Sequence, residues 1–180
     1  WTSGDRDRAD PNAAEEARER CGRGSGHAAS PADRRTGSRY VGAYAGLKAA
    51  DTSLVIAAFA SWHESHEAAR RALDGGLYLI EHCALETYSV LTRLPPPHRV
   101  SGEVVRDFLT ARFPGPWLRM NEKAFRDFIL GLPDRTVAGG AAYDALVAAT
   151  AVGCEAELVT CDRRALLVYE RYGLRTQLLP

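Results

Sequence analysis

The segment AAYDALVAATAVGCEAELVTCDRRALLVYERYGLRTQLLP (residues 141–180) holds two helix–strand units in succession. Its alanine-rich start predicts a helix over 141–152, and the short apolar run ELVT predicts a strand over 157–160. We expect a second helix over 163–172 and a final strand over 175–179. Since strands that alternate with helices usually pair in parallel under a cover of helices, this segment predicts an α/β fold.

The same alternation extends towards the N-terminus. We expect strands over 46–50, 77–81 and 116–120. We expect helices over 53–73, 84–94, 102–113 and 122–131. The first of these helices should be broken around 62–65, and Ser101 should cap the third. The first of these strands is poor in branched side chains, because it reads GLKAA. The whole pattern favours one mostly parallel sheet with helices on both faces.

Residues 1–40 differ in composition from the rest of the chain. They are rich in Gly, Ser, Pro, Arg and Asp and contain almost no large apolar residue after Trp1. Such a segment buries too little surface to offset its ordering entropy. We therefore expect residues 1–40 to be a disordered tail or upstream sequence outside the functional chain, and residues 41–180 to form one domain.

Composition excludes several classes of protein. The 23 Lys and Arg residues balance the 23 Asp and Glu residues, so bulk charge does not indicate a nucleic-acid or membrane partner, although a local basic rim can still bind RNA. No G-x-G-x-x-G or G-x-x-x-x-G-K-[ST] motif indicates a dinucleotide or nucleoside triphosphate site. No segment approaches the roughly 20 apolar residues of a membrane span, and no signal peptide is recognisable. We expect a soluble, cytoplasmic protein.

Four acidic residues occupy corresponding places in this pattern. Asp51 and Asp162 each follow an expected strand, Glu86 lies near the start of the helix after the second strand, and Asp144 lies in the first turn of its helix. These places meet at the carboxyl edge of a parallel sheet, where ligands bind. Because close carboxylates raise each other's pKa, a divalent cation would stabilise them together. Each acid alone also has a structural explanation, as a helix cap, a turn residue or the partner of an arginine.

The sequence around these acids resembles a known family. DTSLVIAAF (51–59), ALETYSVLTRL (84–94), AAYDALVAATA (141–151) and LVTCDRRA (158–165), in this order, are similar to PIN-domain nucleases, and most of all to VapC-type toxins of bacterial toxin–antitoxin pairs. The resemblance covers about residues 50–179 and implies a PIN-like three-layer α/β/α sandwich. The family's catalytic and metal-binding acids match Asp51, Glu86, Asp144 and Asp162, and its supporting hydroxyls match Ser53 and Thr160.

The resemblance implies a Mg²⁺- or Mn²⁺-dependent endoribonuclease that hydrolyses RNA phosphodiesters with a metal-activated water. It also implies a cognate antitoxin and a homodimer. Arg93, Arg163 and Arg164 are candidate contacts for RNA or the antitoxin, with a solvated surface arginine as the alternative. A housekeeping RNA-processing PIN nuclease and a non-catalytic PIN interaction module remain open as alternative functions.

Overall fold

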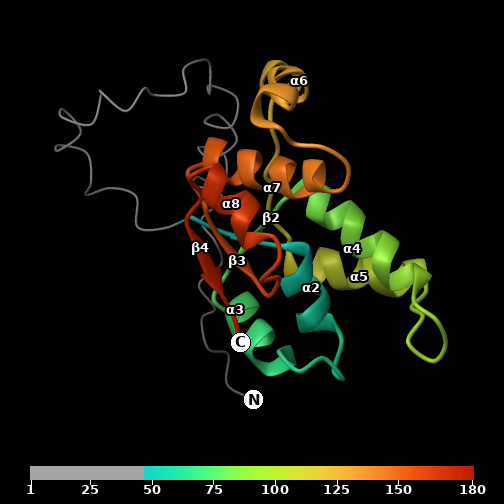
Figure 1. Cartoon of the computed structure of the whole chain (residues 1–180). Coiled ribbons are helices and arrows are strands. Elements are labelled where there is room, and N and C mark those ends of the chain that lie inside the picture. Colours follow the sequence, from blue (N-terminus) through green and yellow to red (C-terminus); the bar gives the residue numbers. More distant parts are fainter. Residues whose placement is uncertain (1–46) are drawn as a thin grey trace.

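The computed structural model describes residues 47–180, and its centre is a four-stranded parallel sheet (Figure 1). The strands are β1 (Lys48–Ala50), β2 (Tyr78–Leu79), β3 (Glu157–Thr160) and β4 (Thr176–Leu178), in the order β2-β1-β3-β4. In this register Ala50 lies beside Leu79 on one side and Val159 on the other. The predictions for residues 1–40, and for 41–46 at the start of the domain, lie outside the described residues.

Seven α-helices and one 3-10 turn connect these strands in the described part of the chain. They are α2 (Thr52–Phe59), α3 (His66–Asp74), α4 (Glu81–Arg93), α5 (Gly102–Arg112), α6 (Glu122–Gly131), η1 (Pro133–Arg135), α7 (Ala141–Gly153) and α8 (Leu166–Arg171). Helix α2 packs against α3 and α4, α4 against α5, and α7 against α8 and β3. The predicted three-layer α/β/α sandwich is confirmed.

The weakest predicted strand is the central one. In β1, Ala49 and Ala50 are fully buried between β2 and β3, so their small side chains leave room for the helices that cover the sheet. Around them the core gathers larger apolar side chains from both sheet and helices. These include Leu54, Leu79, Ile80, Leu91, Val105, Leu158, Val159 and Tyr169.

Two predicted elements differ in the structure. The expected strand 116–120 is only a single bridge, in which Leu118 N donates to Leu79 O (2.7 Å) and Glu81 N donates to Leu118 O (3.0 Å). Pro114 and Pro116 have no amide hydrogen, which explains why pairing does not extend further. The predicted helix 163–172 begins only at Leu166, because the residues after Asp162 form a turn.

The helix boundaries otherwise follow local signals. Ser101 caps α5 as predicted, and Asn121 caps α6 by accepting from Ala124 N (2.7 Å). The predicted break after α2 is present, since α3 starts only at His66. Helix α4 starts at Glu81, three residues before the predicted start at residue 84, and this shortens β2 to two residues. None of the helices within residues 47–180 is long and apolar enough to cross a membrane.

Candidate active site

Asp51 lies between β1 and α2, at the carboxyl edge of the central strand. Its side chain is 5% exposed. It is the N-cap of α2, with Oδ1 accepting from Thr52 N at 2.8 Å. Burial, the largest effect, raises the pKa of this carboxyl, while its hydrogen bonds oppose that rise. A buried carboxylate that caps a helix in this way is held in one orientation.

Two hydroxyls fix the other oxygen of Asp51. Oδ2 accepts from Ser53 Oγ at 2.7 Å and from Thr160 Oγ1 at 2.5 Å. The oxygens of these two hydroxyls lie 3.1 Å apart. Each also accepts a hydrogen bond from a backbone amide just after β3. Cys161 N donates to Ser53 Oγ (2.9 Å), and Asp162 N donates to Thr160 Oγ1 (3.0 Å). The predicted supporting hydroxyls therefore link Asp51 to the turn that carries Asp162.

Glu86 reaches the same region from α4. One oxygen, Oε2, accepts from Thr52 Oγ1 at 2.7 Å. Helix α4 starts at residue 81, so Glu86 lies in its second turn rather than at its start. Thr52 is a contact of the site that the sequence did not predict, although its place directly after Asp51 was an available signal. The alternative role of Glu86 as the partner of an arginine is not observed in the described part of the chain.

Asp144 completes the group from the first turn of α7. Its pKa is raised first by burial and then by the charges of Asp51, Asp162 and Glu86, while Arg164 lowers it. The charges of the other three acids therefore disfavour ionisation of Asp144, as neighbouring carboxylates do. Asp144 has no hydrogen bond within the described residues that would offset these effects.

Asp162 is the member of the group that pairs with an arginine within residues 47–180. Its side chain is 32% exposed, and Oδ1 accepts from Arg164 N (2.8 Å) and from Arg164 Nε (3.4 Å). The turn role considered for this residue is thus present together with its place in the acidic group. Arg164 itself is 93% exposed and therefore free to follow an anionic ligand.

The other two predicted arginines lie farther from these contacts. Arg93 is the last residue of α4, two helical turns beyond Glu86, and Arg163 lies in the turn after β3. Both are exposed, and neither has an ion-pair partner within residues 47–180. Their predicted contacts with RNA or an antitoxin stay predictions.

Two aromatic features next to the acids were not anticipated. Tyr169 of α8 is 1% exposed, and burial followed by the charges of Asp51 and Asp144 raises the pKa of its hydroxyl. At the rim, the rings of His82 and Tyr143 stack with centroids 5.3 Å apart and planes 6° from parallel. This stack joins α4 to α7 beside the carboxylates.

The donor chemistry of this group suits a hard divalent cation. Magnesium and manganese prefer carboxylate oxygens, and a cation would reduce the repulsion that raises the pKa of Asp144. Within residues 47–180, no three His, Cys, Asp or Glu side chains lie close enough together to hold a metal ion in their present positions. The residues fit such an ion in kind, and Asp144 is the acid of the group with no hydrogen bond to another described residue that a metal ion would have to replace.

Comparison with known proteins identifies the family. The PIN domain matches residues 49–171. "Ribonuclease VapC40" of Mycobacterium tuberculosis, found in strains CDC 1551 / Oshkosh and ATCC 25618 / H37Rv, is 47% identical over 131 residues, which are 73% of this chain and 98% of the relative. "Ribonuclease VapC27" of Mycobacterium tuberculosis (strain ATCC 25618 / H37Rv) is 38% identical over 133 residues, covering 70% of this chain and 92% of that protein. The chain therefore belongs to the PIN-domain family, among its VapC-type members.

Proposed function

We propose that this protein is an endoribonuclease that hydrolyses RNA phosphodiester bonds and acts as the toxin of a toxin–antitoxin pair. The observation that carries the proposal is the hydrogen-bond network around Asp51, in which Ser53 and Thr160 bond its carboxylate and Thr160 also accepts from the amide of Asp162. The names of the two relatives, both ribonucleases, support the reaction class. Their similarity to this chain spans 98% of the first relative and 92% of the second.

The four acids have different roles in this proposal. Asp51, Asp144 and Asp162 would hold Mg²⁺ or Mn²⁺, and Glu86 would bind the same ion or orient a water through the oxygen that Thr52 leaves free. The bound ion would activate the attacking water and offset charge on the phosphate oxygens. Ser53 and Thr160 keep the Asp51 carboxylate in place throughout, because their hydroxyls bond it in the folded protein.

The arginines would offset the remaining repulsion between an RNA strand and an acidic site. Arg163 and Arg164 follow Asp162 directly and are exposed, so they can contact phosphates beside the scissile bond. The same side chains, with Arg93, are suitable contacts for a cognate antitoxin that blocks the site. We also propose that the protein acts in the cytoplasm. We further propose that it forms a homodimer, and light scattering on the purified protein measures the mass that tests this.

The test of the function compares the wild type with Asp144→Asn, using Asp107→Asn on α5 as the matched control. Asp107 is an exposed acid that pairs with Arg106. RNA 5′ ends are mapped after expression in cells, and purified proteins are assayed on the mapped RNA with Mg²⁺, with Mn²⁺ and with chelator. We expect discrete cuts with a 5′-phosphate and a 3′-hydroxyl from the wild type and Asp107→Asn, none from Asp144→Asn, and none with chelator.

Each alternative predicts a different result. A housekeeping nuclease would cut RNA without arresting growth and would have no small antitoxin gene beside its own. A non-catalytic PIN module would give the same RNA ends for wild type and Asp144→Asn, and that result would refute the proposed activity.

A further inference from the structure

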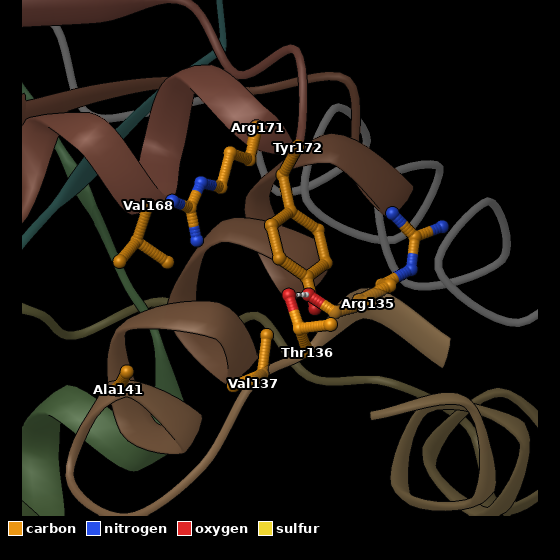
Figure 2. Close-up of a pocket in the computed structure, with 7 residues that line it drawn as sticks. All are labelled: Arg135, Thr136, Val137, Ala141, Val168, Arg171 and Tyr172. Atoms are coloured by element: carbon orange, nitrogen blue, oxygen red, sulfur yellow. Dashed lines mark hydrogen bonds between the residues drawn. The ribbon is translucent and has the colours of Figure 1, made fainter. Parts of the chain in front are cut away.

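A cavity of about 240 Å³ lies between the turn after η1, the start of α7 and helix α8 (Figure 2). Thr136 and Val137 line it from the turn, Ala141 from the start of α7, and Arg171 and Tyr172 from the end of α8. Ala141 and Asp144 lie three residues apart on α7, and thus about one helical turn from each other. The cavity therefore reaches to about one helical turn from Asp144, and none of the four acids lines it.

The charged side chains around the cavity are cationic. Arg135 and Arg171 both line it, and neither pairs with a carboxylate within residues 47–180. The Arg135 guanidinium lies 4.9 Å from the centre of the Tyr172 ring, an arrangement that holds it by a cation–π contact. In Figure 2 the Tyr172 ring stands between the side chains of the two arginines. Two unpaired guanidinium groups around one cavity favour an anionic ligand.

A hydroxyl at the cavity also lacks an acceptor. Tyr172 Oη is buried and has no hydrogen-bond partner among the described residues. Burial of an unpaired hydroxyl costs roughly 1–3 kcal/mol, so buried hydroxyls are normally satisfied by the protein, by water or by a ligand. An oxyanion in the cavity would supply the missing acceptor beside the two arginines.

The backbone at the cavity is held in an uncommon conformation. Thr136 has φ of 52°, in the left-handed region that β-branched residues rarely adopt. Its hydroxyl donates to the Arg135 carbonyl (2.7 Å), as Figure 2 shows, and this bond helps to hold the turn. Strained residues of this kind are concentrated at binding and catalytic sites.

Size and lining narrow the class of ligand. At about 240 Å³ the cavity is smaller than the roughly 300–1,000 Å³ of a typical small-molecule site, so it suits a single group rather than a whole cofactor. The apolar side chains of Val137, Ala141 and Val168 face the same space as the arginines. A phosphate that carries part of a ribose has this combination of a charged end and a less polar body.

We propose that this cavity binds a backbone phosphate, with part of its ribose, of the RNA strand that runs through the acidic site. This inference rests on the proposed ribonuclease function. It assigns to Arg135, Arg171 and Tyr172 the positioning of the strand at a nucleotide next to the one that is cut. Recognition there is independent of base sequence, because only the backbone is contacted.

The test measures binding of a fluorescent 12-nucleotide single-stranded RNA as a function of salt. All proteins carry Asp162→Asn, so that the RNA stays intact during the measurement. Arg171→Ala and Arg135→Ala should each weaken binding roughly tenfold and make the salt dependence shallower by about 0.7 in log–log slope, the loss of one phosphate contact on a single strand. Tyr172→Phe keeps the ring under Arg135 and should weaken binding without changing the slope, since the hydroxyl carries no charge.

Controls separate this site from general charge effects. Arg106→Ala on α5 removes one exposed arginine with the same change in net charge and should leave affinity and slope as they were. Arg171→Lys keeps the charge but loses the planar guanidinium fork, and it should fall between the wild type and Arg171→Ala. Thermal unfolding of each variant shows that the proteins compared are folded.

Three results would overturn the inference. If the Arg135 and Arg171 variants bind RNA as Arg106→Ala does, while the wild type with an intact Asp162 cuts RNA, the cavity site is refuted and the ribonuclease function stands. A poly-glutamate peptide is the second probe. If Arg171→Ala loses binding of this peptide but keeps its affinity for RNA, the cavity binds carboxylates of a protein and not an RNA phosphate. A wild type that neither binds nor cuts RNA would refute the ribonuclease function and, with it, this inference.

Discussion

Replacement of Thr160 by Val tests whether the hydroxyls around Asp51 hold the acidic site together. Thr160 is fully buried at the end of β3, and valine has nearly the same shape without the hydroxyl. The substitution removes the 2.5 Å bond to Asp51 Oδ2 and the acceptor for Asp162 N at 3.0 Å. Asp51 and the turn that carries Asp162 therefore each lose a hydrogen bond when the Thr160 hydroxyl is removed.

The size of the effect follows from these two bonds. A hydrogen bond to a charged group contributes about 1.5–3 kcal/mol and a neutral one about 1 kcal/mol, so Thr160→Val should lower the free energy of unfolding by roughly 2.5–4 kcal/mol. For a domain of this size that corresponds to a fall in Tm of roughly 10 °C. Thr160→Ser keeps the hydroxyl and loses one methyl group, so it should cost only about 1 kcal/mol.

The loss of stability should depend on pH. The bond from Thr160 is the strongest of the hydrogen bonds that lower the pKa of Asp51, while burial raises that pKa above its unfolded value. Folding stability therefore falls as pH rises through the folded pKa of Asp51, and it falls further in the valine variant, whose folded pKa is higher still. The difference between wild type and Thr160→Val should be small in acid and reach its full size once Asp51 is ionised in both proteins.

Urea unfolding of the wild type, Thr160→Ser and Thr160→Val across a pH series measures the free energy of unfolding of each protein and its dependence on pH. We expect the order wild type, serine, valine, with the gap between serine and valine widening as pH rises. RNA cleavage should follow the same order, because Asp51 and Asp162 lose their fixed positions. Equal stability of the serine and valine variants, or a gap that does not depend on pH, would show that the hydroxyl does not hold Asp51.

Other substitutions test separate parts of the site. Asp144→Asn should raise Tm at neutral pH, because it removes a carboxylate whose pKa is raised by burial and by the neighbouring acids. This gain in Tm should disappear as the pH falls below the ordinary pKa of Asp, where the wild-type side chain is neutral as well. Thermal unfolding over a pH series measures the trend, and a gain that does not change with pH contradicts the prediction. Thr52→Val should lower cleavage with a stability cost of about 1–2 kcal/mol, since Glu86 loses its 2.7 Å bond, and unchanged turnover would show that Glu86 needs no such support. Leu91→Ala in α4 should cost about 2–5 kcal/mol in urea unfolding and leave the cleavage pattern unchanged, because this buried side chain packs the core away from the acids.

The fold was largely predictable because its signals are local. Ser101 and the alternation of β3, α8 and β4 are visible in the residues themselves, and the structure contains each of them. The central place of β1 was less accessible, since two alanines look like a poor strand by propensity. Burial on all sides, which depends on residues about thirty and about a hundred positions away, is what stabilises that strand.

The site was predictable in its acids and less so in its contacts. The position of an acid after a strand or at a helix start is enough to place Asp51, Asp144 and Asp162 at one edge. The bond from Thr52 to Glu86 depends on how α2 packs on α4, and the cavity beside Tyr172 depends on a turn with a left-handed threonine. Neither arrangement leaves a periodic pattern in the sequence.

The acids differ in burial and in hydrogen bonding, since Asp51 is buried and Glu86, Asp144 and Asp162 are partly exposed. Asp51, the most buried, has hydrogen bonds to both oxygens and so tolerates its position without moving. Asp144 has no such bonds and carries the repulsion of the other three acids, so its side chain gains most from a cation. Asp162 lies at the accessible side with Arg164. Under the proposed function, an RNA strand that approached from this side would meet Arg164 before the buried Asp51, and the positive charge would offset part of the repulsion between the polyanion and the acids.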